Sequence, residues 1–177
     1  MDLLKYSFIF LAISFILASP DSGYAGSSLK KLSKDLVKLE DGKLIKAKDL
    51  DLSSKKYVAF YYSANWCPPC KGFTPKLVEF YETMTKKYGD QFEMVFVSSD
   101  YSEEAMKEYM EWGKMSWPAV DFKDREDGFL RDHSARGIPY LVVLDQSGKE
   151  VLGKPEGEDW VYPGKLLPDF EKLLKEG

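Results

Sequence analysis

Two neighbouring motifs say most about how this chain folds: Tyr57–Val58–Ala59–Phe60–Tyr61–Tyr62 and Cys67–Pro68–Pro69–Cys70. The first is a continuous apolar and aromatic run, which is typical of a strand buried on both faces. The second precedes apolar residues at helical spacing, so we predict a helix over residues 67–87 with a stripe of Leu77, Val78, Phe80, Tyr81 and Met84. Pro75 should kink or restart this helix, with Thr74 as a local cap. The cysteine pair therefore lies where a buried strand gives way to a helix.

That position suggests a reactive thiol. A thiol at a helix N-terminus faces unpaired amides, whose partial positive charge favours the thiolate and lowers the thiol pKa. The spacing brings Cys70 alongside Cys67 on one turn, close enough for a disulfide, and the two prolines between them remove amide donors and stiffen the loop. Trp66 would shield one side of the reactive sulfur, and Lys71 adds a positive charge nearby.

A purely structural disulfide is the alternative interpretation of this pair. The loop-entropy relation gives roughly 2 kcal/mol for a four-residue loop against about 3 kcal/mol for 15 residues, so a stabilising disulfide would more usefully join distant segments. Haem attachment needs a histidine directly after the second cysteine, and position 71 is lysine. We therefore favour a redox dithiol.

The rest of the chain completes a mixed α/β pattern. We predict helix and then a hairpin near Gly42 within residues 29–42, strands at Phe92–Val97, Tyr140–Asp145 and Glu150–Leu152, and helices from Ser102 to about Trp112, over Phe129–Ala135 and over Leu166–Lys175. This order predicts a central mixed β-sheet flanked by α-helices, in one domain over residues 26–177.

Composition sets limits on function. The chain has 177 residues, 44% hydrophobic and 31% charged, which is the profile of an ordinary globular protein. Its formal net charge is −4, so we expect no nucleic-acid partner. Two cysteines and one histidine are too few for an intrachain structural zinc site, and we expect no metal and no cofactor. We expect a monomer.

Residues 1–25 are interpreted as a cleaved export signal. Segment 7–18 is uncharged and apolar but shorter than the about 20 residues that span a bilayer. Pro20 follows, and Gly23 and Ala25 place small residues at −3 and −1 of a cut before Gly26. The protein should then be periplasmic if bacterial, and otherwise secreted or in the endoplasmic reticulum lumen. An uncleaved membrane anchor is the alternative.

At this point a family resemblance is clear. Residues 63–75 resemble the active-site stretch of the thioredoxin superfamily, specifically its tryparedoxin/nucleoredoxin branch. Residues 114–120 resemble that branch's second signature, with departures at Ser116 and Pro118. Gly137–Ile138–Pro139 is similar to the cis-proline segment, followed by Tyr140 where threonine is usual. The resemblance covers about residues 30–175 and implies a thioredoxin fold and dithiol–disulfide exchange.

The resemblance also implies roles for single residues. Cys67 would be the exposed nucleophile, and Cys70 would resolve the mixed disulfide, leaving a Cys67–Cys70 disulfide. Pro139 would be cis and lie against the active site, presenting the backbone of Ile138 to substrate. Trp117 would lie near the active-site edge, whereas Trp112 and Trp160 are expected to be packing residues.

One departure concerns proton transfer. Thioredoxins carry a buried aspartate six residues before the first cysteine, where this chain has Tyr61. Asp100, after the second strand, is the candidate proton acceptor for Cys70. Its alternative interpretation is a solvated residue where the next helix begins.

These observations favour a thiol–disulfide oxidoreductase that reduces disulfide-containing client proteins. Its dithiol would be renewed by a membrane or soluble thiol electron donor. A disulfide oxidase or isomerase is the first alternative, and a non-catalytic binding module of the same fold is the second.

Overall fold

The computed structural model describes residues 20–177, with side chains from Gly26 onward. Residues 1–19, the greater part of the expected export signal, lie outside the described residues. Helix α1 (Pro20–Leu32) includes the expected cleavage point before Gly26. The structure does not test cleavage, which stays a prediction. Within the described residues, no helix is both long enough and apolar enough to cross a bilayer.

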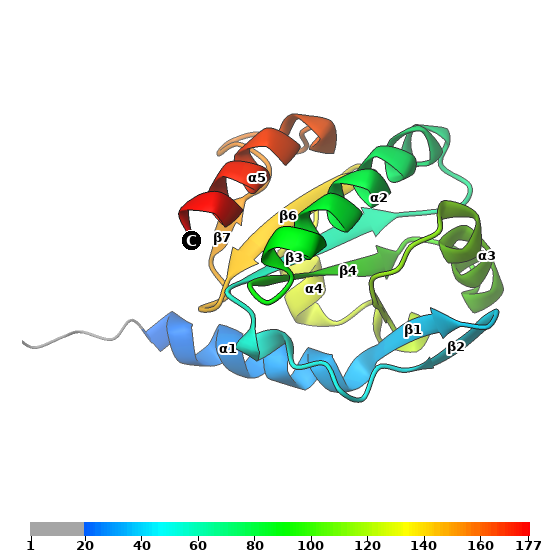
Figure 1. Ribbon diagram of the computed structural model, residues 1–177, viewed down its shortest axis with the longest axis horizontal. Coiled ribbons are helices and arrows are strands. Elements are labelled where there is room, and N and C mark those ends of the chain that lie inside the picture. Colours follow the sequence, from blue (N-terminus) through cyan, green and yellow to red (C-terminus); the bar gives the residue numbers. More distant parts are fainter. Residues whose placement is uncertain (1–19) are drawn as a thin grey trace, which may run out of the picture.

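A seven-stranded mixed sheet forms the centre of the domain, in the order β2-β1-β5-β4-β3-β6-β7 (Figure 1). Its strands are β1 (Leu36–Glu40), β2 (Lys43–Lys46), β3 (Tyr57–Ser63), β4 (Phe92–Ser98), β5 (Ala119–Val120), β6 (Tyr140–Asp145) and β7 (Glu150–Leu152). The β3–β4 and β4–β5 pairs are parallel, and the other pairs are antiparallel. The predicted mixed sheet is confirmed.

Both faces of the sheet are covered. The remaining helices are α2 (Pro68–Tyr88), α3 (Glu103–Gly113), α4 (Gly128–Asp132) and α5 (Leu167–Glu176). Tyr57, Ala59 and Tyr61 of β3 pack in a core cluster with side chains of α2, α3 and α5. The alternate β3 residues belong to a second cluster with α1 and α4. All seven residues of β3 are buried, which is why residues 57–62 form a continuous apolar and aromatic run before Ser63.

Local sequence explains how several elements begin and turn. Asp41 and Gly42 have positive φ angles, 48° and 71°, as a two-residue hairpin turn requires, and they join β1 to β2. Ser102 caps α3 as predicted, because its Oγ accepts a hydrogen bond from the Ala105 amide at 3.2 Å. Helix α1 ends at Leu32, so the helical spacing of leucines does not continue into β1.

Pro75 does not restart the helix, and the predicted kink stays a prediction. Helix α2 is one helix from Pro68 to Tyr88, with Pro75 inside it on the exposed side. Thr74 does not cap a new start, because its hydroxyl donates to the Cys70 carbonyl one turn back, at 3.0 Å. Pro75 has no amide hydrogen to donate within the helix. The Thr74 side chain supplies an additional hydrogen bond in the same turn. Strand β5, which has only two residues, was not predicted.

Candidate active site

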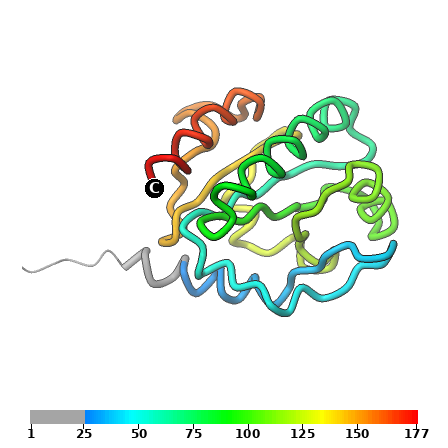
Figure 2. The backbone as a smooth tube through the Cα atoms, viewed as in Figure 1, coloured from blue at the N-terminus to red at the C-terminus, as the bar shows by residue number. Residues whose placement is uncertain are grey.

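A disulfide joins Cys67 and Cys70 where β3 leads into α2, and the trace in Figure 2 follows this short turn. Cys67 is the N-cap residue of α2, and its Sγ accepts a hydrogen bond from the Cys70 amide at 3.3 Å. The first two helical positions are the prolines 68 and 69, which have no amide hydrogen. The positive end of the helix therefore reaches the Cys67 sulfur through the Cys70 amide.

The two sulfurs are shielded to different degrees. Cys70 is fully buried and Cys67 is 3% exposed, so the nucleophile is less exposed than the family resemblance implied. One reason is that the Cys67 Sγ lies 3.8 Å from the carbonyl oxygen of Ile138. Cys67 nevertheless remains the more accessible of the pair, next to the exposed Trp66. The order of attack implied by the resemblance remains compatible with this burial.

The segment opposite the disulfide has the expected backbone. The Ile138–Pro139 peptide bond is cis, which confirms that prediction. The Pro139 carbonyl accepts a hydrogen bond of 2.8 Å from the indole nitrogen of Trp160. Trp160 is 37% exposed, so this side chain borders the site as well as packing against it.

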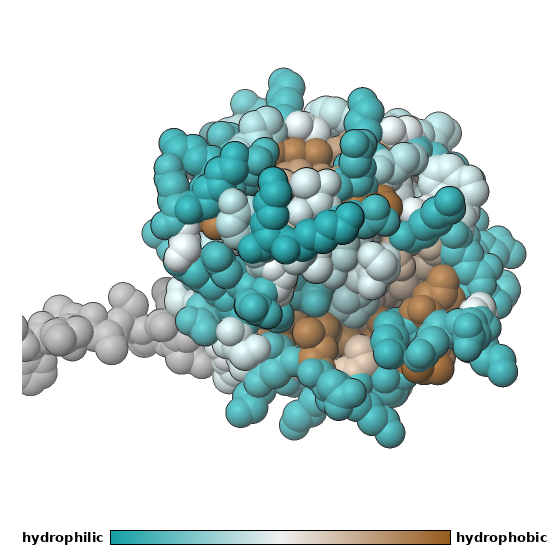
Figure 3. All heavy atoms as spheres, in the orientation of Figure 1, coloured by the Kyte–Doolittle hydropathy of each residue, from teal (hydrophilic) through white to brown (hydrophobic). Residues whose placement is uncertain are grey.

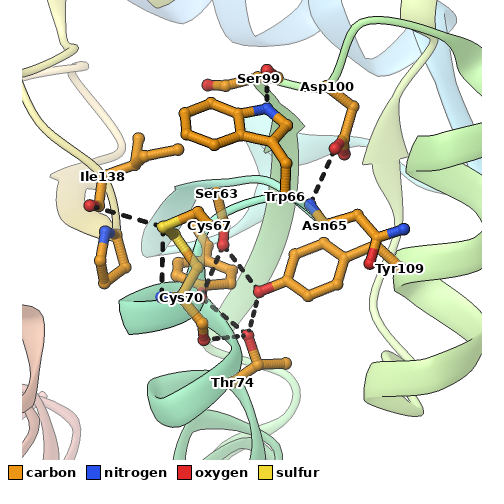
Figure 4. Close-up of a disulfide and its surroundings, with 12 residues drawn as sticks. Ser63, Asn65, Trp66, Cys67, Cys70, Thr74, Ser99, Asp100, Tyr109 and Ile138 are labelled. Atoms are coloured by element: carbon orange, nitrogen blue, oxygen red, sulfur yellow. Dashed lines mark hydrogen bonds between the residues drawn. A yellow bond between two sulfur atoms is a disulfide. The ribbon is translucent and has the colours of Figure 1, made fainter.

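A second loop fixes the residues before Cys67. Trp66 donates from its indole nitrogen to the Ser99 carbonyl at 3.1 Å and stacks on Tyr101, with ring centroids 5.7 Å apart. One Asp100 carboxylate oxygen accepts from the Asn65 amide at 2.8 Å, and the other accepts from the Ser98 hydroxyl at 2.9 Å. Figure 4 shows this carboxylate directed at Asn65. The loop after β4 thus holds the loop that carries the nucleophile.

Asp100 is not a solvated residue, because it is only 2% exposed. Burial raises the pKa of its carboxyl above the ordinary value of 3.8. The structure brings Asp100 to the active-site loop, but the hydrogen bonds described above bind it to Asn65 and Ser98. Its role as proton acceptor for Cys70 stays a prediction.

Trp117 does not lie at the active-site edge. It is fully buried, and its ring meets Tyr81 of α2 edge-on, with centroids 5.1 Å apart. Tyr81 in turn bonds Glu93 near the beginning of β4, whereas the cysteine pair follows the end of β3, the parallel neighbour of β4. Trp117 is therefore a core residue away from the disulfide.

Four buried hydroxyl groups lie behind Cys70, and sequence reasoning missed them. Tyr61, Ser63, Thr74 and Tyr109 are all fully buried. Their oxygens form a closed ring (Figure 4): Tyr61–Ser63 2.9 Å, Ser63–Tyr109 2.9 Å, Tyr109–Thr74 2.6 Å and Thr74–Tyr61 2.9 Å. We call this set the hydroxyl ring. The signal for it was a serine ending the apolar run and a threonine on the inward side of α2.

The hydroxyl ring stands where thioredoxins have an aspartate. It ties Cys70 to β3 and α3, because the Thr74 hydroxyl donates its one hydrogen to the Cys70 carbonyl and accepts from the Tyr61 and Tyr109 hydroxyls. Burial raises the pKa of Tyr61 far above its ordinary value, so this phenol stays neutral. The ring consequently offers hydrogen bonds and positioning but no carboxylate base.

Metal ligands are not clustered in the part of the chain that the structure describes, where no group of three or more His, Cys, Asp or Glu side chains could hold an ion.

Comparison with known proteins agrees with this geometry. A family model described as thioredoxin-like matches residues 55–150. The chain belongs to the thioredoxin-like family. Tryparedoxin from Trypanosoma brucei brucei is 34% identical over 119 residues, which cover 61% of this chain and 80% of that protein. Tryparedoxin II from C. fasciculata superposes with a TM-score of 0.62 at 31% identity, covering 84% of this chain and 91% of the other.

Within the family, the chain belongs to the tryparedoxin and nucleoredoxin branch. Probable nucleoredoxin 1 from Arabidopsis thaliana is 38% identical over 152 residues, which cover 85% of this chain and 25% of that protein. The thioredoxin-like chain thus spans about a quarter of the length of the nucleoredoxins that it matches. Family membership and the Cys67–Cys70 pair together make this chain a thioredoxin-like protein with a disulfide-bonded cysteine pair at the helix start.

Proposed function

We propose that this protein reduces disulfide bonds in client proteins. The observation that carries the proposal is the hydrogen bond from the Cys70 amide to the Cys67 Sγ at the beginning of α2. In the reduced protein the same amide would stabilise a Cys67 thiolate, which is the form that attacks disulfides. Cys70 is fully buried directly behind it, so an incoming disulfide meets Cys67 first.

The reaction has two exchange steps. The Cys67 thiolate attacks one sulfur of the client disulfide, forms a mixed disulfide and releases the other client sulfur as a thiolate. Cys70 then loses its proton and attacks the Cys67 sulfur, which releases the second client thiolate and leaves the Cys67–Cys70 disulfide. Two electrons pass to the client. A membrane or soluble thiol donor must return them to this chain by the reverse exchange.

Trapping the mixed disulfide tests the order of attack. In Cys70→Ser the first step proceeds and the second cannot, so client proteins should accumulate on Cys67 and be released by dithiothreitol. In Cys67→Ser the remaining thiol is buried, so no adduct should form. Equal trapping by both variants would contradict the assignment. Undiminished cellular function of Cys67→Ser would instead favour the binding module.

The reduction potential tests the direction of electron flow. The oxidised and reduced forms are equilibrated with defined thiol–disulfide buffers, and the ratio of the two forms is measured. A value near about −270 mV is expected for a reductant, whereas a value near about −120 mV would make the protein an oxidant that introduces disulfides.

We also propose that the protein acts as a monomer outside the cytosol, after removal of residues 1–25. Support comes from the uncharged segment 7–18 and the small residues before Gly26. The mass of the protein isolated from its native cells should correspond to a chain that starts at Gly26. A full-length mass in the membrane fraction would favour the uncleaved anchor. Light scattering of the purified protein tests the proposed monomer, for which the measured mass should equal that of one chain.

A further inference from the structure

Residues 153–162, which follow β7, form a loop that we call the strap. The face drawn in Figure 3 is mostly hydrophilic, with only small hydrophobic patches. Among the described residues, six large hydrophobic side chains are exposed, and the strap carries two of them, Trp160 and Tyr162. Both rings make specific contacts although part of their surface faces solvent.

The strap binds the segment opposite the disulfide, residues 136–140, which we call the proline segment. The indole nitrogen of Trp160 donates a hydrogen bond to the Pro139 carbonyl at 2.8 Å. The Trp160 ring also lies against Gly137, where an added methyl carbon would be 3.3 Å from the Trp160 Cδ1 atom. Because glycine has no side chain, the ring can approach the backbone this closely. Trp160 therefore contacts the residues on both sides of Ile138.

Two further contacts fasten the strap at the ends of the proline segment. The Lys154 amide donates to the Tyr140 hydroxyl at 3.2 Å. The Asp159 carboxylate accepts from the Arg136 guanidinium at 3.1 Å, and the Asp159 carbonyl accepts from the Arg136 amide at 3.4 Å. Both side chains of this ion pair are highly exposed, so the pair contributes little to stability. The partly buried hydrogen bonds of Trp160 and Lys154 are therefore the stronger attachments.

The strap also reaches the helix that carries the cysteines. The Tyr162 ring meets Phe73 of α2 edge-on, with centroids 5.6 Å apart, and lies 6.4 Å from the Trp160 ring. Val161 packs against the core cluster that contains both cysteines. The strap thus connects α2 on one side of the site with the proline segment on the other.

The Ile138 carbonyl is the group that these contacts hold near the reactive sulfur. Its oxygen lies 3.8 Å from the Cys67 Sγ, and the same sulfur accepts from the Cys70 amide at 3.3 Å (Figure 4). In the reduced protein, the amide favours the thiolate. The carbonyl accepts the hydrogen of the thiol, and its partial negative charge disfavours the thiolate. The carbonyl therefore opposes the amide.

We propose that Trp160 is a positioning residue, whose hydrogen bond to Pro139 holds the Ile138 carbonyl beside the Cys67 Sγ and so limits the stability of the Cys67 thiolate. A dithiol whose thiolate is less stabilised is a stronger reductant. This inference deepens the proposed function and rests on it only for the direction in which electrons flow.

The pH profile of Cys67 alkylation tests this role without any client. In a Cys70→Ser protein Cys67 is the only thiol, and its rate of reaction with iodoacetamide follows the thiolate fraction. Trp160→Phe keeps a ring over Gly137 but cannot donate to Pro139. Alkylation below the pH midpoint should become about twofold to fivefold faster, because a thiol is a weak donor and its hydrogen bond contributes little. The pH midpoint should fall accordingly.

A second variant loosens the same contact from the other partner. The methyl group of Gly137→Ala pushes on the Trp160 ring, so this variant should also lower the midpoint. Tyr162→Phe is the matched control, because it changes the neighbouring ring of the strap and keeps the contact with Phe73. It should leave the midpoint unchanged.

None of these three substitutions removes a charge at the pH of the measurement. The titratable groups on the elements that meet at the site remain in every variant: Tyr61, Lys71, Asp100, Tyr101, Tyr109, Arg125, Arg136, Tyr140 and Asp159. A difference in midpoint therefore reports the position of the carbonyl rather than a lost charge.

Three results would overturn the inference. The first is a midpoint that does not fall in Trp160→Phe or in Gly137→Ala. The second is an equal fall in Tyr162→Phe. The third is a faster plateau rate at high pH with an unchanged midpoint, which would mean that Trp160 only shields the sulfur.

Equilibration with defined thiol–disulfide buffers separates the two proposals. If the wild-type protein is an oxidant and the midpoint falls in Trp160→Phe, the proposed reductase function is wrong and the positioning role stands. If the wild-type protein is a reductant and the midpoint does not fall, the function stands and Trp160 has no such role. A reductant whose equilibrium moves towards the reduced form in Trp160→Phe, with a lowered midpoint, supports both.

Discussion

Replacing Asp100 by Ala and by Asn separates the hydrogen bonds of this carboxylate from its charge. In Asp100→Ala, the Asn65 amide and the Ser98 hydroxyl lose the acceptors that they meet at 2.8 and 2.9 Å. A buried donor left unpaired costs about 1–3 kcal/mol, and the Ser98 hydroxyl can rotate to another acceptor, so we expect a loss of about 1–3 kcal/mol from the Asn65 amide. Urea unfolding at pH 7 measures this loss as a lower transition midpoint.

Asp100→Asn should be far milder. Its amide oxygen still accepts from the Asn65 amide, and its amide nitrogen can donate to the Ser98 oxygen, which also accepts from the residue 100 amide at 3.0 Å. We therefore expect a change below about 1 kcal/mol at pH 7. If Asn destabilises the protein as much as Ala does, the negative charge itself is needed and the hydrogen-bond account is refuted.

The pH dependence gives the sign of the charge effect. Burial raises the pKa of Asp100 in the folded protein, so the folded state binds more protons than the unfolded state above about pH 3.8. The contribution of Asp100 to stability is therefore complete below that pH and is lost as the pH rises through the folded pKa. Relative to wild type, Asp100→Asn should gain stability over this range. Parallel stability curves for the two proteins would contradict the shift.

The same variant tests the proton-transfer prediction. If Asp100 accepts the Cys70 proton, release of the second client thiol should lose its pH dependence in Asp100→Asn when followed by stopped-flow. An unchanged profile would limit Asp100 to holding the Asn65 loop.

Three further substitutions probe the hydroxyl ring and its surroundings. Thr74→Val removes the donor to the Cys70 carbonyl and should destabilise the protein by about 1–3 kcal/mol and shift its reduction potential, whereas Thr74→Ser should restore both. Gly113→Ala places a methyl group 2.9 Å from the Thr74 methyl carbon and should cost about 1–3 kcal/mol in chemical unfolding. Gly72 is an exposed position of helix α2, where an added methyl group meets nothing within 4 Å, so Gly72→Ala should stabilise the protein by about 0.5–1 kcal/mol and raise its thermal midpoint.

The fold was largely predictable because its main signals are local. Strand β6 has the predicted bounds, and β3 and β4 each extend one residue beyond the prediction. These strands could be predicted because a strand that is buried on both faces has a short, continuously apolar sequence. Strand β5 escaped because two residues carry no periodicity, and only pairing with β1 and β4 makes them a strand. The predicted restart at Pro75 was wrong because whether a helix continues through a proline depends on its tertiary surroundings, which the sequence does not state.

The site was predictable in part for the same reason. The cysteine pair and the cis-proline segment are contiguous motifs, and the structure brings them within 3.8 Å of each other. Burial of single side chains was harder to predict. Trp117 was expected near the site and lies in the core. Trp112 and Trp160 were expected to pack in the core or at its rim, and at 49% and 37% exposed they lie at the rim.

The sequence by itself determined that Cys67 and Cys70 can pair, because two cysteines three residues apart at a helix start lie on the same turn. Only the tertiary structure decided what surrounds them. The hydroxyl ring joins β3, α2 and α3, and Trp160 donates to the Pro139 carbonyl, so both depend on contacts between segments that are separate in the chain. Such contacts follow from how the helices pack on the sheet. The spacing of residues along one segment does not determine this packing.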